Sequence, residues 1–500
     1  MNAASPTATD PTIRRASARV RFDGTEIDLH YRIAGNGPPL FALHPSPLDS
    51  SFLAPLMARL ATRATVIAPD TPGFGDSDPL PAPVVDLAPC VAAMSALRRA
   101  LGLDRVGVYG SATGAQIAVE WAKAEPRALA GVMLDNAAAF EDAERERITA
   151  GYLPEVTPNA DGAHLARAWQ GAHDATLFFP WQSPSAENRI APVIGAPEAM
   201  HVTARGYLRA GPGYAAVYRA AFRNERVENL QSIAIPLVML RWRGSILWRW
   251  TGGLDACDWG SNVTMAHCGP SLDERWACLD AHLDRILPER AVATADLCLD
   301  TGALRHADTS FGQVRYLHKP SATPTRILIP PPGLSATALD PVPDDIAIID
   351  LPGHGGSALP ETLNVAHCVE AIVRVVDSLG GRRLEVAGIG GSDRLARAAA
   401  AADPRLVRRP AAGHPDYSDT PPDLALETSG AHLFRGWHWL REQHFAKDEP
   451  PPDPARLTRM LLDLIDARAA HAALQEPSAA QPEGNPHHRE GARAPDPNAP

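Results

Sequence analysis

The chain repeats part of itself, and this repeat sets its expected domain organisation. Residues 73–77 (GFGDS) recur as residues 353–357 (GHGGS), in both places after an apolar run that ends in Asp and a proline. Three further segments match in the same order: Cys90 with Cys368, residues 108–114 (VYGSATG) with 387–392 (AGIGGS), and 162–169 with 430–437, which both read GAHLxRxW. Four matches in one order predict an internal duplication, with copies near residues 18–290 and 306–470.

In the first copy, short apolar runs alternate with helical stretches. Residues 20–33 alternate apolar and polar side chains around Asp23-Gly24, which predicts an antiparallel hairpin. Strand-like runs follow at 40–47, 64–70, 105–110 and 131–135, separated by helical stretches at 52–60, at 85–100 and from Gly114 onward. Strands separated by helices predict an α/β fold with a mainly parallel sheet and helices on both faces.

The second copy is shorter than the first. After GAHLxRxW, the first copy continues with strand candidates at 235–240 and 262–267 and a helix at 272–287, whereas the second has one helix at 454–473. The final segment is rich in Pro, Gly, Ala and charge, which predicts disorder. We therefore expect the following parts: a flexible arm (1–17), a first unit (18–290) with a cap at about 140–230, a linker (291–305), a truncated second unit (306–473) and a tail (474–500).

Charge and composition exclude several classes of function. The net charge of −11 is spread along the chain, so the clustered basic face of a nucleic-acid-binding protein is not expected. No apolar run approaches the ~18 residues of a membrane span. The six cysteines include no C-x-x-C pair, which indicates neither a zinc site nor a disulfide framework. The N-terminus also lacks the apolar segment of a secretory signal, so we expect a cytoplasmic protein with no metal, nucleic-acid or membrane partner.

The order of these motifs resembles the α/β-hydrolase superfamily. The features that carry the resemblance are the His44-Pro45 loop after the third strand, the D-x-P-G-x-G-x-S turn, a strand–turn–helix, a helical cap and a late histidine. They cover nearly all of the first copy and about half of a unit in the second. The resemblance implies a hydrolase of a small organic substrate, an ester or a C–C bond, that works without a cofactor.

The strand–turn–helix, or nucleophile elbow, departs from the family pattern G-x-S-x-G, in which the serine attacks the substrate. Residues 110–114 read GSATG, so Ala112 occupies the nucleophile position, and Gly390 occupies it in the second copy. Neither side chain can attack a substrate. Ser111 could do so only if the turn shifted by one residue, which would crowd Tyr109 into the place of the first glycine. The alternative is that Ser111 caps the following helix.

The resemblance also places the general base and the acid of a triad. His267 follows the last strand of the first copy, where the family carries its histidine, and a solvent-facing structural histidine is the alternative. The acid stays open among three residues. Asp135 ends an earlier strand, whereas Asp255 and Asp258 are the first carboxylates after the preceding strand.

Further residues are candidates for the pocket. His44 and Ser46 lie in the oxyanion loop, beside Ala112 and Thr113, whereas the matching loop of the second copy is three prolines (330–332) without an N–H donor. Substrate-binding candidates are the following: His164, Arg167 and Trp169 in the cap, and Trp242 in a segment rich in Trp and Arg. The repetition of the cap motif favours a structural role for it, and the Trp–Arg segment could equally pack against the cap.

Two functions remain open at this point. One is an enzyme that acts through Ser111 in a distorted elbow or through His267 and water. The alternative is a pseudoenzyme that binds a small molecule or serves as a scaffold. The loss of the nucleophile in both copies favours a departure from serine hydrolysis. A sheet that stops early leaves an open edge and an uncovered face. We therefore expect the non-catalytic second copy to dock on the first as an intramolecular pseudo-dimer, with a homo-oligomer of whole chains also open.

Overall fold

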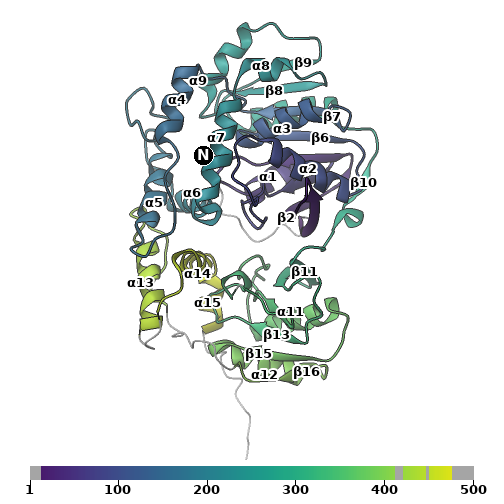
Figure 1. Cartoon of the computed structure of the whole chain (residues 1–500), viewed down its shortest axis with the longest axis vertical. Coiled ribbons are helices and arrows are strands. Elements are labelled where there is room, and N and C mark those ends of the chain that lie inside the picture. Colours follow the sequence, from purple (N-terminus) through teal and green to yellow (C-terminus); the bar gives the residue numbers. More distant parts are fainter. Residues whose placement is uncertain (1–12, 340, 412–420, 446–449, 476–500) are drawn as a thin grey trace, which may run out of the picture.

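The computed structural model describes residues 13–339, 341–411, 421–445 and 450–475, which form two lobes (Figure 1). The first lobe, residues 13–293, holds an eight-stranded sheet, and the second lobe, residues 304–475, holds a six-stranded sheet. In Figure 1 the first lobe runs from purple to teal and the second from green to yellow. None of the helices in these described ranges is long and apolar enough to cross a membrane.

The sheet of the first lobe has the strand order β1-β2-β5-β4-β6-β7-β8-β9. Its strands are β1 (Arg14–Phe22), β2 (Thr25–Ala34), β4 (Pro39–Leu43), β5 (Thr65–Pro69), β6 (Val106–Ser111), β7 (Leu129–Asp135), β8 (Leu237–Trp242) and β9 (Val263–Cys268). The predicted hairpin, β1 with β2, is antiparallel, and the strands from β4 onward pair in parallel. Strand β1 begins at Arg14, so the end of the expected flexible arm belongs to the sheet. Residues 1–12 lie outside the described residues.

Helices cover both faces of this sheet. Face A packs against α1 (Ala54–Leu60) and α10 (Leu272–His282), and its buried side chains include Tyr109, Met133 and Leu240. Face B packs against α2 (Ala88–Ala100) and α3 (Thr113–Ala124), and its buried side chains include Val108, Val132 and Met239. Successive side chains of a strand point to opposite faces, so these two sets identify the face of every neighbouring residue.

Between β7 and β8 the chain forms helices, in the region expected to be a cap. They are α4 (Asp142–Gly151), α5 (Ala163–Asp174), α6 (Pro197–Ala210), α7 (Tyr214–Asn224) and α8 (Val227–Gln231). The short α9 (Trp248–Thr251) follows β8. The expected linker, 291–305, contains strand β10 (Val292–Ala293), which pairs with β3 (Asn36–Gly37), and the start of β11.

The second sheet repeats the strand order of the first six strands of the first sheet. Its order is β11-β12-β14-β13-β15-β16, with β11 (Leu304–Thr309), β12 (Gly312–Leu317), β13 (Arg326–Ile329), β14 (Ile346–Ile349), β15 (Leu384–Gly388) and β16 (Leu406–Arg408). Its helices are α11 (Val365–Ser378), α12 (Asp393–Ala402), α13 (Ala431–Phe445), α14 (Pro454–Asp466) and α15 (Arg468–Gln475). The chain thus has an α/β-hydrolase fold followed by a second mixed sheet. Of the expected tail, residues 476–500 lie outside the described residues.

The two lobes share one apolar core. Leu165 of α5 and Met200 of α6 belong to the same buried cluster as Leu433 of α13 and Leu461 of α14. In Figure 1, α5 and α6 lie at the lower edge of the first lobe, with α13 and α14 of the second lobe below them. Burial of apolar side chains from both lobes against each other stabilises their association.

Candidate functional site

The strand–turn–helix expected to be the elbow has a strained backbone at Ala112. Strand β6 ends at Ser111, helix α3 begins at Thr113, and Ala112 between them has φ 47° and ψ −111°. A positive φ is unusual for a residue with a Cβ. A Cβ on Gly110 would lie 2.4 Å from the carbonyl oxygen of Gly114, so the crossing of strand and helix requires glycine there. Ala112, which the sequence offers for the nucleophile position, is thus the residue with the strained backbone at this turn.

Ser111 lies beside this turn as a strand residue. It is buried at the end of β6, and no hydrogen bond to its hydroxyl occurs within the described part of the chain. The N-cap of α3 is Ala112, so the expectation that Ser111 caps the helix is wrong. The shifted turn is not adopted either, because the positive φ lies at Ala112 and Tyr109 is an ordinary strand residue.

Asp135 is held by two neighbours on face A of the sheet. Its fully buried carboxylate accepts a hydrogen bond of 2.7 Å from the Tyr109 hydroxyl and one of 2.9 Å from Arg275 Nε, on α10. Burial and the adjacent Asp135 raise the pKa of Tyr109 well above its ordinary value, so the phenol stays protonated. Asp135 thus forms a buried ion pair with Arg275.

His267 contacts a different carboxylate. Its Nε2 lies 3.5 Å from Asp255 Oδ1, and Asp255 also forms an ion pair with Arg241. The side chains of His267 and Asp255 are 57% and 45% exposed, so this pair faces solvent. Of the three candidate acids, Asp255 is the one that the fold places against His267. Asp258 is exposed and forms no ion pair with any described residue.

His267 is not brought together with Ser111 and Asp135, which are register partners on neighbouring strands. Asp135 lies two residues after Met133, on face A, whereas His267 lies two residues after Met265, which packs on the face B core. His267 also lies on β9, three strands from β6, and three strand spacings amount to about 14 Å. Among the described residues, no hydrogen bond or ion pair links Ser111 to either Asp135 or His267.

The loop expected to bind the oxyanion contacts the turn of residues 71–78. His44 is buried, its Nε2 accepts a hydrogen bond of 2.9 Å from the Thr71 N–H, and its ring lies 5.7 Å from that of Phe74. His44 therefore stabilises the turn 71–78 and is engaged there. Ser46 is largely buried and retains an N–H between two prolines.

Several buried polar atoms at the carboxyl edge of the sheet have no hydrogen-bond partner among the described residues. They are Thr113 Oγ1, Asp135 Oδ1, Asn136 Oδ1 and Trp250 Nε1. Thr113 and Asn136 follow the ends of neighbouring strands, since Ser111 pairs with Asp135 in the register of β6 and β7. An unsatisfied buried polar group costs about 1–3 kcal/mol. These atoms are therefore candidates for contact with a polar ligand beside the elbow.

The substrate-binding candidates lie elsewhere than expected. His164 Nε2 lies 2.8 Å from Thr458 Oγ1, and Trp169 Nε1 donates a hydrogen bond of 3.0 Å to the Thr428 carbonyl, so both residues contact the second lobe. Arg167 is exposed on α5. Trp242 is buried on face A, where its Nε1 donates to the Ser271 carbonyl at 3.1 Å. The structure thus places none of the four beside the elbow.

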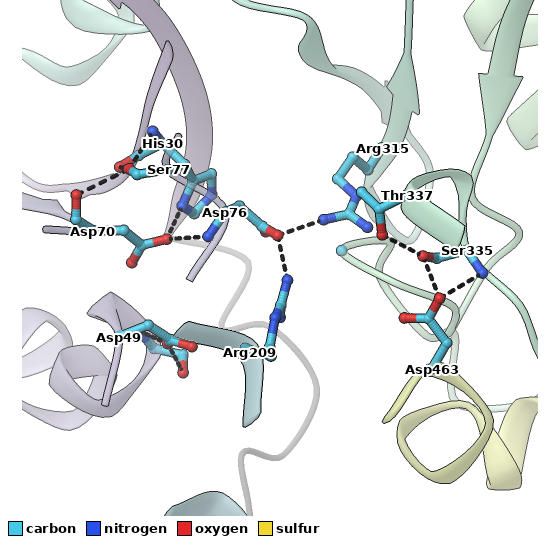
Figure 2. Close-up of polar contacts among 12 residues, drawn as sticks. His30, Asp49, Asp70, Asp76, Ser77, Arg209, Arg315, Ser335, Thr337 and Asp463 are labelled. Atoms are coloured by element: carbon cyan, nitrogen blue, oxygen red, sulfur yellow. Dashed lines mark hydrogen bonds and ion pairs between the residues drawn. The ribbon is translucent and has the colours of Figure 1, made fainter. Parts of the chain in front are cut away.

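A buried polar cluster between the lobes was not predicted (Figure 2). The carboxylate of Asp76 forms ion pairs with Arg209 of α6 and with Arg315 of β12. Burial alone would raise the pKa of Asp76, but the two guanidinium groups hold it well below its usual range. Burial raises the pKa of Asp463, which accepts from the Ser335 hydroxyl, to about 6. The sequence held one indication of this cluster: the repeated turn carries Asp76 in the first copy and Gly356 at the same place in the second.

Two surface cavities lie away from the elbow. One, of about 330 Å³, is lined by residues of the second sheet, including Arg326 and Glu385. The other, of about 490 Å³, lies between Arg14, Asn36 and Cys298. Neither includes Ala112 in its lining.

Comparison with known proteins identifies one region. Residues 38–191 match the family model described as alpha/beta hydrolase fold. Among curated proteins, an uncharacterized protein of Mycobacterium tuberculosis is 34% identical over 107 residues, which is 21% of this chain and 31% of the relative. A soluble epoxide hydrolase of a Corynebacterium species is 37% identical over 94 residues, 19% of this chain and 32% of that protein. The 2-hydroxy-6-oxononadienedioate/2-hydroxy-6-oxononatrienedioate hydrolase 2 of Pseudomonas putida is 33% identical over 122 residues, 23% of this chain and 43% of the enzyme.

The chain thus matches less than half of each of these relatives. Among solved structures, an esterase of Thermogutta terrifontis has a TM-score of 0.41 at 17% identity, covering 55% of this chain and 99% of the esterase. Epoxide hydrolase CorEH has a TM-score of 0.38 at 19% identity, covering 54% of this chain and 98% of the enzyme. The family match assigns residues 38–191, within the first lobe, to an α/β-hydrolase fold, and the second sheet is an additional α/β region.

Proposed function

We propose that the first lobe is a pseudoenzyme of α/β-hydrolase ancestry that binds a small organic ligand beside its elbow. The observation that carries this proposal is Ala112 at φ 47°, a nucleophile position with the elbow backbone and no nucleophile. Such a conformation costs about 1–3 kcal/mol and persists where the surrounding structure enforces it. Here the close packing of Gly110 and Gly114 enforces it.

The ligand expected at this place is a small molecule with a hydrogen-bond acceptor such as a carboxylate. The first N–H groups of helix α3 have no partner within the helix, and the N-terminus of a helix favours negative charge. The unpartnered Thr113 Oγ1 lies in the same turn. The names of two relatives, an epoxide hydrolase and a hydrolase of an oxononadienedioate, also indicate small organic molecules.

Two assays separate binding from catalysis. We expect the protein to be unlabelled by a fluorophosphonate probe and inactive on short p-nitrophenyl esters. In thermal-shift assays, a panel of small carboxylates should include compounds that raise the melting temperature, and Thr113→Val should weaken this effect because it removes the hydroxyl at nearly constant volume. Labelling that is lost in Ser111→Ala would instead identify a serine hydrolase.

A second candidate function is hydrolysis through water activated by His267. It is supported by the contact of His267 with Asp255 and by their exposure to solvent. In this case His267→Ala and Asp255→Asn would both abolish turnover, and no covalent adduct would form at any stage. Asp258→Asn is the matched control, since Asp258 forms no ion pair with the described residues and its loss should leave turnover unchanged.

We further propose that the second lobe arose by duplication and serves as a non-catalytic, built-in partner of the first. Gly390 at its elbow and the prolines of its oxyanion loop leave it without a nucleophile or a donor there. The continuous core of α5, α6, α13 and α14 supports the docking. A fragment of residues 1–300 should aggregate or lose thermal stability. A soluble, monomeric fragment of unchanged stability would contradict this role.

A further inference from the structure

The contact between helices α5 and α13 is reciprocal. The His164 ring lies 5.2 Å from the Trp437 ring, and the His432 ring lies 4.9 Å from the Trp169 ring. His164 and His432 hold the same place in the repeated GAHLxRxW motif, as do Trp169 and Trp437. In a two-fold interface, residue i of one subunit contacts j of the other while j contacts i. The lobes therefore meet as two like subunits would.

The next helix of each lobe follows the same symmetry. Helices α6 and α14 both begin with a proline and both follow the repeated motif. Alignment on these prolines pairs His201 with Thr458. His164 Nε2 lies 2.8 Å from Thr458 Oγ1, and the His432 ring lies 5.8 Å from the His201 ring, so this contact is also reciprocal. The two helices occupy equivalent places in the interface.

The charged residues of these helices break the symmetry. In the same alignment, Arg205 of α6 corresponds to Leu462 of α14, and Arg209 corresponds to Asp466. Arg205 Nε lies 2.7 Å from Asp466 Oδ2, and His201 Nε2 lies 3.3 Å from Asp466 Oδ1. Two copies of the first lobe would place an arginine where Asp466 lies, against Arg205 and His201. Like charges at this point oppose pairing of the first lobe with itself.

A second pair across the lobes is asymmetric in the same sense (Figure 2). His30 on β2 and Arg315 on β12 are equivalent, because the N–H of each donates to the hydroxyl of the serine in the following repeated turn. Arg315 Nη1 lies 2.9 Å from Asp76 Oδ1 of the first lobe. The residue equivalent to Asp76 is Gly356, so the second lobe offers no acid to His30.

Burial makes this second pair selective. The side chain of Arg315 is 2% exposed and that of Asp76 is 13% exposed. Two copies of the second lobe would leave Arg315 with Asp350 of its own lobe alone, and two copies of the first would leave Asp76 with Arg209 alone. Loss of one ion pair from a buried cluster is destabilising, because the remaining charges are less well compensated. The first lobe with the second is the combination that satisfies both groups.

We propose that these two asymmetric pairs select the partner: opposite charges direct the first lobe to the second lobe and not to a second copy of itself. The ring contacts between α5 and α13 are alike on both sides of the symmetry, so the charged pairs distinguish like from unlike pairing. The proposal rests on the proposed role of the second lobe as a built-in partner and names the residues that choose it.

Charge exchange in the full-length chain tests the proposal. Asp466→Arg gives the second lobe the residue that the first lobe carries at this place. Arg205→Asp reverses the charge of its partner in the first lobe. We expect each single variant to lower the melting temperature by several degrees and to increase the radius of gyration in small-angle X-ray scattering as the lobes separate. Asp49 Oδ2 also lies 3.6 Å from Arg205 Nη1, so the exchange is made together with Asp49→Asn. In that background we expect Arg205→Asp/Asp466→Arg to recover at least half of both changes, since opposite charges meet again.

A milder variant and a matched control complete the test. Asp466→Asn removes the charge without reversing it and should fall between the wild type and Asp466→Arg. Equal effects of Asn and Arg, or additive effects in the double variant, would overturn the proposal because the sign of the charge would not matter. The same exchange in Arg326 and Glu385, an ion pair of 3.1 Å within the second lobe, should leave the radius of gyration unchanged. A change there as large as at the interface would also overturn the proposal.

Failure of this exchange would differ from failure of the docking itself. If the lobes dock but charge does not select the partner, the fragment of residues 1–300 still loses stability while the charge variants behave additively. If the lobes do not depend on each other, the fragment keeps its stability.

Discussion

Arg275 on α10 donates a hydrogen bond of 2.9 Å to the carboxylate of Asp135 at the end of β7. Asp135, which the sequence offered as the acid of a triad, is therefore bound to Arg275. The contact also ties α10 to face A of the sheet, where Arg275 lies 5.2 Å from the ring of Trp242. The contact of Asp135 with Arg275 therefore joins the end of β7 to α10.

Loss of Arg275 should destabilise the first lobe strongly. Arg275→Ala leaves the fully buried carboxylate of Asp135 without its cation, and removal of one partner of a buried pair costs about 3–5 kcal/mol. Urea denaturation followed by circular dichroism measures this loss. Arg59→Ala is the control, because the Arg59–Asp280 pair is more exposed and such pairs contribute about 0–1 kcal/mol. Similar losses in the two variants would show that Asp135 does not depend on Arg275.

The strain at Ala112 should be removed by glycine. Ala112→Gly should stabilise the protein by about 1 kcal/mol, since glycine adopts a positive φ without steric cost. Ala118→Gly, in the middle of α3, should have the opposite sign and cost about 1 kcal/mol. Thermal unfolding of both variants checks the prediction. A destabilised Ala112→Gly protein would mean that the turn stores no strain.

Restoring a hydroxyl at the elbow should not restore hydrolysis. Ala112→Ser places a serine at the nucleophile position, but His267 lies three strands away and Asp135 is bound to Arg275. We expect a folded variant that a fluorophosphonate probe does not label. Labelling of Ala112→Ser, absent from the wild type, would show that a base reaches the elbow after all.

The interface histidines should make stability depend on pH. Burial lowers the pKa of His164 and of His432 from 6.5 to about 4. The folded state then binds fewer protons than the unfolded state between these values. Their contribution to stability is fully present above pH 6.5 and is lost as the pH falls toward 4. Urea midpoints at pH 7.5 and pH 5 should differ less in His164→Gln/His432→Gln than in the wild type.

Asp463 should act in the opposite direction. Burial raises its pKa from 3.8 to about 6, so the folded state binds more protons than the unfolded state between these values. The associated stability is present below pH 3.8 and is lost as the pH rises through 6. Asp463→Asn should therefore raise the urea midpoint at pH 7.5 and change it little at pH 4. Asp466→Asn is the contrast, because Arg205 and His201 outweigh burial and lower the pKa of Asp466, so its loss should destabilise at pH 7.5.

Local features were predictable from the sequence. The Asp23-Gly24 hairpin, the alternation of strands and helices, and Ala112 at the turn between β6 and α3 all depend on residues close together in the chain. Their signals are periodicity, glycine and a strained turn, which act over a few residues. The same local pattern recurs in the second lobe, where the strand order of the first six strands is repeated.

The partners of the candidate residues were decided by the tertiary structure. The sequence could not tell that Asp135 meets Arg275, that Asp255 meets His267, or that His164 and Trp169 contact the second lobe. These pairs join residues far apart in the chain, and which of them meet depends on sheet face, strand order and the docking of the lobes. The sequence by itself therefore determined the fold class and the residue at the turn between β6 and α3. Tertiary packing decided which charged side chains form ion pairs and which aromatic rings lie in contact.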